Sequence, residues 1–530
     1  MERTNPPVAR IIGSGIAGIS AAIRLARKGY AVEVHEANTY PGGKLSQFRL
    51  GAYRFDAGPS LFTLPEHVEA LFTLCGEQAA DHFPYLKKDE SCRYFWEDGT
   101  RLVAHSDPEA FALEAEKQLG EPAAHTRAHL ALARTQYQAT SGFFLERSLH
   151  SWRTYLRPAI FRTLAAVPSL GLTRTMDAMH RKRFVSPHMV QLFNRYATFN
   201  GSSPYQAPGT LCMIPHLEFG VGTFLPKRGM VDITHSLVAL AERQGVEFHY
   251  GHRVAQIIYE GRRATGIRLE SGEVLGAEVI VSNMDVTPTY RRLLPQLPAP
   301  EATLRAERSS SALIFYWGLD RLFPELNLHN ILFSDQYEAE FQALFETKTL
   351  FSDPTVYINI TSKDVPEDAP KGGENWFVMI NAPSNDGQDW DALRHQAREA
   401  ILAKIHRVLG VDIAPHIVEE DFLDPVRIES RTSSDRGALY GSSSNSAMAA
   451  FLRHPNRGSL KNLYFCGGSA HPGGGIPLCL LSGKIVGDAV QRPSRCTGVC
   501  EALQETQMFS STRWIPFPKK MREIFAKLSV

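Results

Sequence analysis

The stretch VARIIGSGIAG, residues 8–18, decides how this chain folds. Its apolar first half predicts a short strand, and Gly13-Ser14-Gly15-Ile16-Ala17-Gly18 predicts a turn that opens a helix. Small residues continue from there, and Gly29 stands where a helix commonly ends. Residues 31–35 then alternate as a second strand that ends at Glu36. Together these residues predict a β-α-β unit.

Each glycine of this turn has a physical task. Gly13 permits the tight turn, Gly15 lets the backbone approach a pyrophosphate, and Gly18 lets the helix and the strand pack closely. The helix N-terminus offers unpaired N–H groups and the positive end of the helix dipole to the phosphates. Glu36 can accept hydrogen bonds from ribose hydroxyls. The pattern therefore predicts a dinucleotide site, and Glu36 argues against NADP, whose 2′-phosphate it would repel.

A second glycine cluster follows at once. Pro41-Gly42-Gly43-Lys44-Leu45 comes just after the acidic residue, and Phe55-Asp56-Ala57-Gly58-Pro59-Ser60 comes shortly afterwards. Two neighbouring clusters suit a large cofactor whose far end also lies against backbone, such as FAD, whereas a plain NAD fold does not require the second one. Two surface turns are the alternative explanation of these glycines.

Composition narrows the classes of protein. The chain has 530 residues and a formal net charge of +1, from 57 Lys and Arg against 56 Asp and Glu. This balance excludes a generally polybasic nucleic-acid binder, and 43% hydrophobic against 21% charged residues excludes a mostly disordered chain. Seven scattered cysteines fit a reducing compartment better than a disulfide framework. No apolar signal-peptide core and no run of 18 apolar residues occurs, so we expect a cytoplasmic protein that can still lie on a membrane surface.

The rest of the chain alternates between strand-like and helix-like stretches, which indicates an α/β core with insertions. Residues 143–184 differ, because basic side chains outnumber acidic ones there and are interleaved with aromatic ones. Residues 226–281 predict a helix and then two strand pairs with turns at Glu260-Gly261 and Ser271-Gly272. Further strand candidates lie at 312–317, 356–360 and 376–380, and a glycine-rich segment returns at 467–475. No metal-ligand cluster with convincing spacing is visible, so we expect no metal site.

The glycine motifs and several later segments resemble those of the FAD-dependent carotenoid desaturases, the phytoene desaturase family. The later matches are Pro226-Lys227-Arg228-Gly229-Met230, Ser282-Asn283-Met284-Asp285, Ser311-Ala312-Leu313-Ile314-Phe315-Tyr316-Trp317-Gly318, His329-Asn330-Ile331, Leu463-Tyr464-Phe465-Cys466-Gly467-Gly468 and His471-Pro472-Gly473-Gly474-Gly475-Ile476-Pro477. The similarity covers roughly residues 8–490. The second half is most similar to the bacterial 1-hydroxycarotenoid 3,4-desaturases, also called hydroxyneurosporene desaturases. Arg228 departs from the family, which often has glycine there, and this puts the local turn in question.

The resemblance implies an α/β fold with three parts: a Rossmann-type FAD-binding domain that is discontinuous in the sequence, an α+β substrate domain, and a helical membrane-contacting region. The FAD-binding domain is then built from residues 1–110, 226–290 and 451–490. Residues 111–225 form the helical region that contacts substrate and membrane, residues 291–450 the substrate-binding domain, and residues 491–530 a linker with an amphipathic tail.

The resemblance also assigns cofactor residues. The pyrophosphate is expected at Gly13, Gly15, Ile16, Ala17 and Gly18, the adenosine ribose at Glu36, and the adenine at the backbone of Val254. The path toward the isoalloxazine is expected along Gly43, Lys44, Leu45, Gly58, Pro59 and Ser60, and Gly468, Gly475 and Ile476 complete the flavin site. A helix N-terminus at this last position makes independent physical sense, because reduced flavin gains negative charge near N1 and O2.

The implied activity is removal of a hydride and a proton from adjacent carbons of a C40 polyene, with the hydride going to flavin N5. Quinone or oxygen would reoxidise the FAD. No catalytic side chain can be assigned: we expect His471, Arg153 and Asp56 to be structural, because alignment in an apolar tunnel contributes more than a base when the reacting carbons carry no acidic group. The aromatic-rich stretches 193–199, 219–224 and 313–317 are candidate tunnel lining, or else ordinary core.

A carotenoid has to reach such a protein from a bilayer. Moving about forty carbons through water would cost on the order of tens of kcal/mol, at roughly 0.8 kcal/mol per CH₂ group. One candidate for the membrane contact is residues 143–184, which also fit a solvated helical face. The other is the tail at 513–530, where Met521, Ile524, Phe525 and Leu528 share one helical face among basic residues. We therefore expect peripheral association with a membrane.

Two other kinds of function remain open. A carotenoid isomerase or a retinol-saturase-like flavoenzyme would keep the same motifs without net oxidation. An isoprenoid-binding escort protein of the GDP-dissociation-inhibitor type would share the fold without redox chemistry, although the intact glycine loop with Glu36 and the cluster at 473–475 argue against it.

Overall fold

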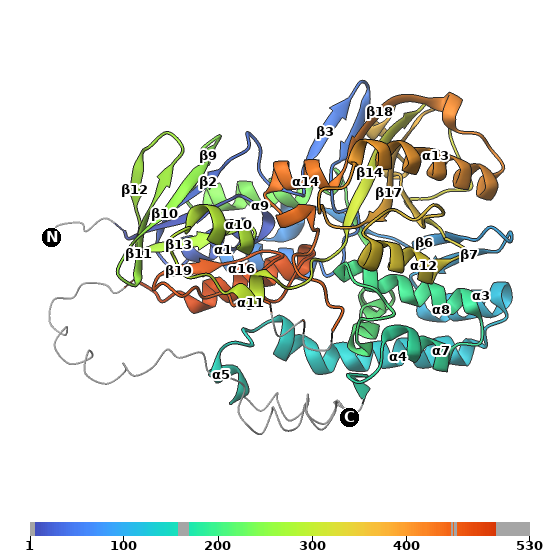
Figure 1. Cartoon of the computed structure of the whole chain (residues 1–530), viewed down its shortest axis with the longest axis horizontal. Helices are drawn as coiled ribbons and strands as arrows, with labels where there is room; N and C mark the ends of the chain where they lie inside the picture. The colour runs from blue at the N-terminus through green and yellow to red at the C-terminus, as the bar shows by residue number, and fades with distance from the viewer. Residues whose placement is uncertain (1–5, 157–168, 447–448, 450–452, 494–530) are drawn as a thin grey trace. The chain divides into compact units, whose positions relative to one another are not determined.

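The computed structural model describes residues 6–156, 169–446, 449 and 453–493 (Figure 1). Residues 1–491 make up one compact unit, and residues 492–530 are a separate unit. The amphipathic tail expected at 513–530 lies outside the described residues.

A five-stranded parallel sheet gathers segments from both ends and the middle of the chain, in the order β19-β13-β1-β2-β9 (Figure 1). Its strands are β1 (Val8–Ile12), β2 (Ala31–Glu36), β9 (Val246–Tyr250), β13 (Val279–Ser282) and β19 (Leu463–Phe465). On the central strand, Ile11 lies opposite Val34 on one side and Val281 on the other. The β-α-β unit predicted at the N-terminus is confirmed, and the sheet is discontinuous in sequence.

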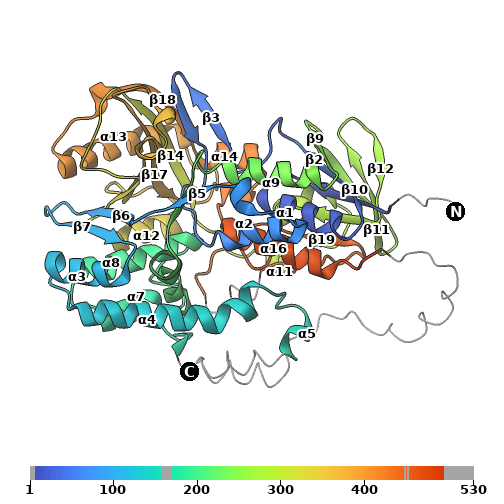
Figure 2. The ribbon, with the colours of Figure 1, turned by 180° about the vertical axis from the view of Figure 1, so that it is seen from behind.

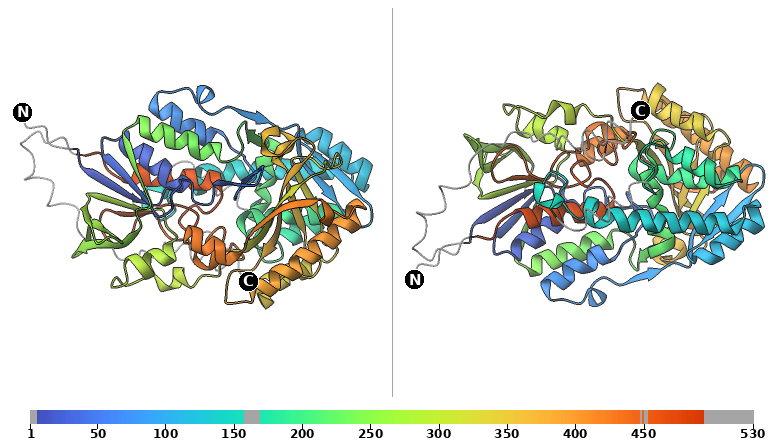
Figure 3. Two further views of the ribbon diagram at one scale, coloured as in Figure 1. Left: turned by 90° about the horizontal axis from the view of Figure 1, so that it is seen from above. Right: turned by 90° about the horizontal axis from the view of Figure 1, so that it is seen from below.

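The two faces of this sheet are covered differently (Figure 3, left). Helices cover one face, where β1 and β2 side chains pack in one apolar cluster with α1 (Ile16–Ala26), α2 (Glu66–Cys75), α9 (Asp232–Arg243) and α16 (Ile476–Ala489). A three-stranded antiparallel sheet covers the other face and consists of β10 (Val254–Glu260), β11 (Arg263–Leu269) and β12 (Val274–Gly276). The two predicted strand pairs with turns at Gly261 and Gly272 are confirmed.

A seven-stranded sheet has the order β18-β14-β17-β16-β15-β6-β7. Its strands are β6 (Glu90–Phe95), β7 (Arg101–His105), β14 (Ser311–Leu319), β15 (His329–Leu332), β16 (Val356–Asn359), β17 (Glu374–Ala382) and β18 (Ile417–Leu423). The three strands predicted between 312 and 380 are confirmed as β14, β16 and β17. One face packs against α13 (Trp390–Leu409), as Figure 2 shows from behind.

The strand pairing departs from the expected domain boundary at residue 110. β6 and β7 fall within 1–110, yet β6 pairs in parallel with β15, so that Tyr94 lies opposite Ile331. These two strands therefore complete the seven-stranded sheet and have no place in the five-stranded one. Strand pairing over such a separation leaves no local sequence signal, because alternation predicts a strand and not its partner.

A helical layer lies beside the seven-stranded sheet (Figure 3, right). It contains α3 (Pro108–Leu119), α4 (Ala123–Thr140), α7 (Met176–Arg183) and α8 (Pro187–Asn194). Among the aromatic-rich stretches, Phe193, Tyr196 and Phe219 are buried here in one cluster. The aromatic side chains of β14 alternate between its faces, with Phe315 on the α13 side and Tyr316 on the opposite face. The burial of these rings fits core packing, and the lining of a substrate tunnel by these stretches stays a prediction.

The remaining helices and strands are short. They are β3 (Gln47–Leu50), β4 (Tyr53–Asp56), β5 (Tyr85–Lys87), β8 (Phe224–Pro226), α5 (Trp152–Tyr155), α10 (Val286–Pro288), α11 (Glu301–Leu304), α12 (Tyr337–Gln342) and α14 (Pro425–Thr432). Within the described residues, every helix is too short or too polar to cross a membrane.

Candidate functional site

The first glycine motif lies at the carboxyl end of β1. Gly13 has a φ of +95° and its N–H donates to the carbonyl oxygen of His35 at 2.8 Å. Helix α1 begins at Ile16, with Gly15 as its N-cap. A Cβ on Gly18 would run into the carbonyl oxygen of Gly13, so only glycine lets the helix pack this close to the turn. The predicted turn and the helix that follows it are formed.

Glu36 ends β2 next to this turn. Its Oε2 accepts hydrogen bonds from the Ser14 N–H at 2.8 Å and the Ser14 hydroxyl at 2.9 Å, and its Oε1 accepts one from the Asn38 N–H at 2.9 Å. A carboxylate oxygen can accept two hydrogen bonds, so Oε1 retains capacity for a ribose hydroxyl. The N–H of His252 donates to the carbonyl oxygen of Glu36 at 2.8 Å, which brings the nearby Val254 to the same end of the sheet.

The second glycine cluster contacts the first. Gly42 and Gly15 form a parallel bridge, and the Gly42 N–H donates to the carbonyl oxygen of Ser14 at 2.9 Å. A Cβ on Gly43 would lie 3.7 Å from the Cα of Gly15. A Cβ on Gly58 would collide with the carbonyl oxygen of Lys44, so the two parts of the cluster also touch each other. Backbone from three sequence segments therefore lines one surface.

Lys44 and Leu45 anchor this loop through their side chains. Lys44 Nζ donates to the carbonyl oxygens of Ala438 at 3.2 Å and Leu439 at 2.9 Å. Burial lowers the pKa of Lys44, and the nearby carboxylate of Asp285 opposes this shift. Leu45 is buried in the same apolar cluster as Ile476. These residues can face a cofactor only with their backbone groups or with the edges of their side chains.

The C-terminal glycine motif opens α16. Gly475 is the N-cap, its φ is +102°, and a Cβ there would have no protein atom within 4 Å. A Cβ on Gly483 would lie 2.7 Å from the carbonyl oxygen of Ala17, and one on Gly487 would lie 2.9 Å from the Cβ of Arg24. The later glycine of α16 thus contacts the later residue of α1, so the two helices run parallel. Their positive N-terminal ends therefore lie at the same edge of the sheet.

Asn283 joins the two glycine motifs, a role that the sequence did not assign to it. It follows β13, and its N–H donates to the carbonyl oxygen of Ile12 at 2.8 Å. A Cβ on Gly15 would lie 2.6 Å from Asn283 Nδ2, and one on Gly467 would lie 3.5 Å from the carbonyl oxygen of Asn283. The signal was its place directly after a buried strand, where parallel-sheet proteins bind ligands.

The sequence also did not assign a role to Arg453. Its buried guanidinium donates to the carbonyl oxygens of Tyr440 at 2.8 Å and Gly468 at 3.0 Å through Nη1, and to Ser442 at 2.9 Å through Nη2. Burial lowers the pKa of Arg453 to about 10, so the group stays charged at neutral pH. One side chain thus fixes the approach to the C-terminal glycines, including Gly473, whose missing Cβ leaves room for it.

The polar residues considered for catalysis have structural partners. The carboxylate of Asp56 accepts the N–H groups of Met230 and Val231, each at 3.0 Å, and pairs with Arg54 at 3.0 Å. His471 donates from Nε2 to the carbonyl oxygen of Arg147 at 2.7 Å, and burial lowers its pKa to about 3. The side chain of Arg153 lies outside the described residues.

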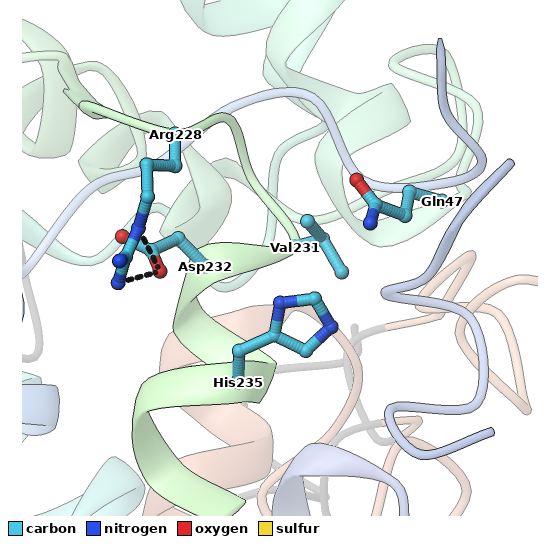
Figure 4. A pocket seen from close by; sticks show the side chains of 5 residues that line it. All are labelled: Gln47, Arg228, Val231, Asp232 and His235. Atoms are coloured by element: carbon cyan, nitrogen blue, oxygen red, sulfur yellow. Dashed lines mark hydrogen bonds and ion pairs between the residues drawn. The ribbon is translucent and has the colours of Figure 1, made fainter. Parts of the chain in front are cut away.

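Arg228 does not disturb its turn. Gly229 has a φ of +86°, and its N–H donates to the carbonyl oxygen of Pro226 at 3.0 Å. Arg228 points outward and pairs with Asp232 at 2.6 Å, on the rim of a small pocket (Figure 4). Gln47, Val231 and His235 complete this lining, which contains none of the predicted cofactor residues.

The residues at the sheet edge fit a flavin dinucleotide. Glycine backbone, two helix N-termini and an acceptor carboxylate are the groups that a pyrophosphate, a flavin ring and a ribose require. Pro59 and Ser60 lie half-buried next to this edge, and Gly468 joins it through Arg453. Across the described part of the chain, no three His, Cys, Asp or Glu side chains come together in a way that could hold a metal ion.

Comparison with known proteins agrees with this chemistry. The model of the flavin-containing amine oxidoreductase family matches residues 16–491. A 1-hydroxycarotenoid 3,4-desaturase of Flavobacterium sp. (strain P99-3) is 52% identical over 481 residues, which is 91% of this chain and 98% of that protein. A 4,4'-diapolycopene oxygenase of Methylomonas sp. is 34% identical, over 91% of this chain and 97% of its own length. A solved structure of wild-type putrescine oxidase bound to putrescine has the same fold, with a TM-score of 0.61 at 13% identity over 91% of this chain and 98% of that one.

Proposed function

Because this chain belongs to the flavin-containing amine oxidoreductases, and within them is a close homologue of a carotenoid desaturase, we propose that it is an FAD-dependent desaturase of a C40 carotenoid. We take its substrate to be a 1-hydroxylated carotenoid that is desaturated at its 3,4 bond. The identity of 52% over nearly the whole relative supports this choice over phytoene.

One observation carries the proposal: α1 and α16 run parallel, and both N-termini face glycine backbone at one edge of the sheet. The N-terminus of α1 would hold the pyrophosphate between Gly13 and Gly18, with the ribose on Glu36. The N-terminus of α16, at Gly475 and Ile476, would favour the negative charge of a reduced ring. FAD supplies the hydride acceptor, and the protein supplies its position and excludes water from it.

We also propose that the protein takes its substrate from a membrane surface. Leu156 and Val185 support this, because they are 71% and 73% exposed, more than the other large apolar side chains of the described residues. Exposed Arg181 and Lys182 lie close to Val185 in sequence and suit anionic lipid headgroups. The protein would then work at the cytoplasmic face of a membrane, with quinone or oxygen as the final electron acceptor.

Purified protein reconstituted with FAD and given liposomes containing phytoene, neurosporene or a 1-hydroxylated carotenoid tests the activity. We expect a flavin absorption band and a product that has lost two hydrogens and absorbs at longer wavelength, formed fastest from the hydroxylated substrate. A product that has gained oxygen would support an oxygenase like the Methylomonas relative. Rearrangement without loss of hydrogen would support an isomerase, and failure to bind FAD would support an escort protein.

A further inference from the structure

His329 is the first residue of β15 and is 4% exposed. Its Nδ1 lies 2.8 Å from the hydroxyl of Tyr357 and 3.2 Å from Nδ2 of Asn359. The same Nδ2 donates to the carbonyl oxygen of Leu328 at 2.9 Å, which fixes it as the nitrogen of that amide. Since the amide nitrogen of Asn359 can only donate, Nδ1 is an acceptor and the ring proton sits on Nε2.

The Nε2–H group has no protein acceptor among the described residues. Burial lowers the pKa of His329 to about 3, with Lys88 and Arg195 contributing in the same direction, so the ring is neutral at physiological pH. A buried, unpaired N–H is costly, and proteins retain such groups where they have a use. His329 thus presents a neutral donor that has no partner among the described residues.

This donor is connected to the predicted flavin path. The Tyr357 hydroxyl, which contacts His329, also lies 2.8 Å from the hydroxyl of Ser60, at the end of the second glycine cluster. Ser60 can donate to Tyr357 while Tyr357 donates to Nδ1 of His329, so the chain of hydrogen bonds has one consistent direction. It ends in the free Nε2–H.

The sheet is not fully packed at this place. Tyr357 lies opposite Met379 in the register of β16 and β17. Both side chains keep accessible surface, although their neighbours Ile358 and Ile380 on the opposite face are buried. Ser60 is also half-buried. A ligand that lies along this face would therefore pass between the glycine cluster and His329.

We propose that His329 is a specificity residue, whose Nε2–H donates a hydrogen bond to the hydroxyl oxygen at the end of the carotenoid; this rests on the proposed function. The chemistry requires such a group to be close to the cofactor. In a 1-hydroxycarotenoid, only one carbon separates C1 from C3, so the oxygen lies within roughly 4 Å of the bond that is desaturated at 3,4. When that bond lies beside the flavin, the hydroxyl oxygen also lies next to the flavin path, within reach of a polar residue there.

The test compares two substrates in the same FAD-loaded variant: a 1-hydroxylated carotenoid and the same carotenoid without the hydroxyl. We expect His329→Leu to lower the ratio of their kcat/KM values by about tenfold, the worth of one neutral hydrogen bond. His329→Gln keeps an N–H near the position of Nε2 and should retain most of the ratio. The matched control is His129→Leu, because His129 is also buried with an unpaired Nε2 but lies in α4, where it packs against Phe184 and Phe193.

The outcomes separate this inference from the proposed function. A ratio that is unchanged in His329→Leu overturns the role of His329 while desaturation by the wild type stands. Equal losses on both substrates overturn it too, since they mark a structural residue. If His329→Leu does not accumulate with FAD, Tyr357→Phe decides: it removes one of the two hydrogen bonds that orient the imidazole while Asn359 still keeps the ring proton on Nε2, so the ratio should fall. A wild type that desaturates neither substrate removes the proposed function and this inference with it.

Discussion

At the sheet edge, several glycines matter because they have no side chain. Gly18 leaves room for the carbonyl of Gly13, and Gly475 leaves the start of α16 open. The polar residues work by occupying backbone groups: Glu36 holds two N–H groups and a hydroxyl, and Arg453 holds three carbonyls. The surface offered to a cofactor is therefore mostly backbone, with its shape fixed by a few buried side chains.

The closeness of Gly18 to Gly13 gives a direct prediction. Gly18→Ala would force the start of α1 away from β1, and we expect it to lower the free energy of unfolding by about 1–3 kcal/mol and to reduce FAD retention. Flavin absorbance per protein and a thermal melt measure both effects. Gly276→Ala is the control, because its Cβ would make only an ordinary contact at 3.9 Å. Full flavin content and an unchanged melting temperature in Gly18→Ala would contradict this prediction, because they would show that the loop accommodates the methyl group.

Among the elements, the pair α1 and α16 sets the geometry of the site. Gly483 and Gly487 let α16 approach α1, and the Ser20 hydroxyl donates to the carbonyl oxygen of Leu480 at 3.1 Å. Since the first helix begins near residue 16 and the second near residue 476, close packing brings together two termini that are distant in sequence.

Leu156, which follows α5, and Val185, which precedes α8, are the described residues that we expect to meet the membrane. Replacing Leu156 and Val185 together with Asp should weaken flotation with anionic liposomes by about tenfold or more, because each exposed side chain would bury apolar surface worth about 1 kcal/mol or more in the bilayer. FAD content should not change, since both residues are exposed. Val274→Asp on β12, 56% exposed, is the control. Flotation equal to that of the wild type would exclude these two residues as the contact.

At the scale of the compact unit, buried ion pairs connect segments that lie far apart in the sequence. Arg54 on β4 pairs with Asp368, between β16 and β17, at 2.5 Å, and with Asp56, which holds the backbone of Met230 and Val231. Loss of one partner from such a buried group is strongly destabilising, because it leaves a charge without compensation. Asp56, which the sequence offered as a polar participant in catalysis, thus connects β4 to the backbone before α9.

Stability should depend on pH through buried histidines. Burial lowers the pKa of five of them to about 3 or 4: His35, His180, His329, His454 and His471. The unfolded chain binds protons at these sites below its pKa of about 6.5, whereas the folded chain does not, so stability falls as the pH drops from about 6.5 toward 4. Each site contributes up to about 1.4 kcal/mol per pH unit. Glu340, whose pKa burial raises to about 7, opposes this because it binds its proton in the folded state.

Thermal melts of the FAD-loaded protein at pH 7 and pH 5 measure this dependence, and we expect a clearly lower midpoint at pH 5. His180→Gln removes one of these titrating groups and should make the dependence shallower, whatever its effect at pH 7. A midpoint that is the same at both values would contradict the assignment of neutral buried histidines.

The sequence by itself determined the β-α-β start, the strands β14, β16 and β17, and the family, because glycine spacing and alternation are local signals. By resemblance it also predicted that the two terminal glycine motifs form one cofactor site. Tertiary structure alone decided that β6 joins β15, that Asn283 lies between Gly15 and Gly467, and that His329 connects to Ser60 through Tyr357. The physical reason is that these contacts join segments hundreds of residues apart, where burial and hydrogen-bond partners are fixed by how whole sheets pack and leave no periodic trace along the chain.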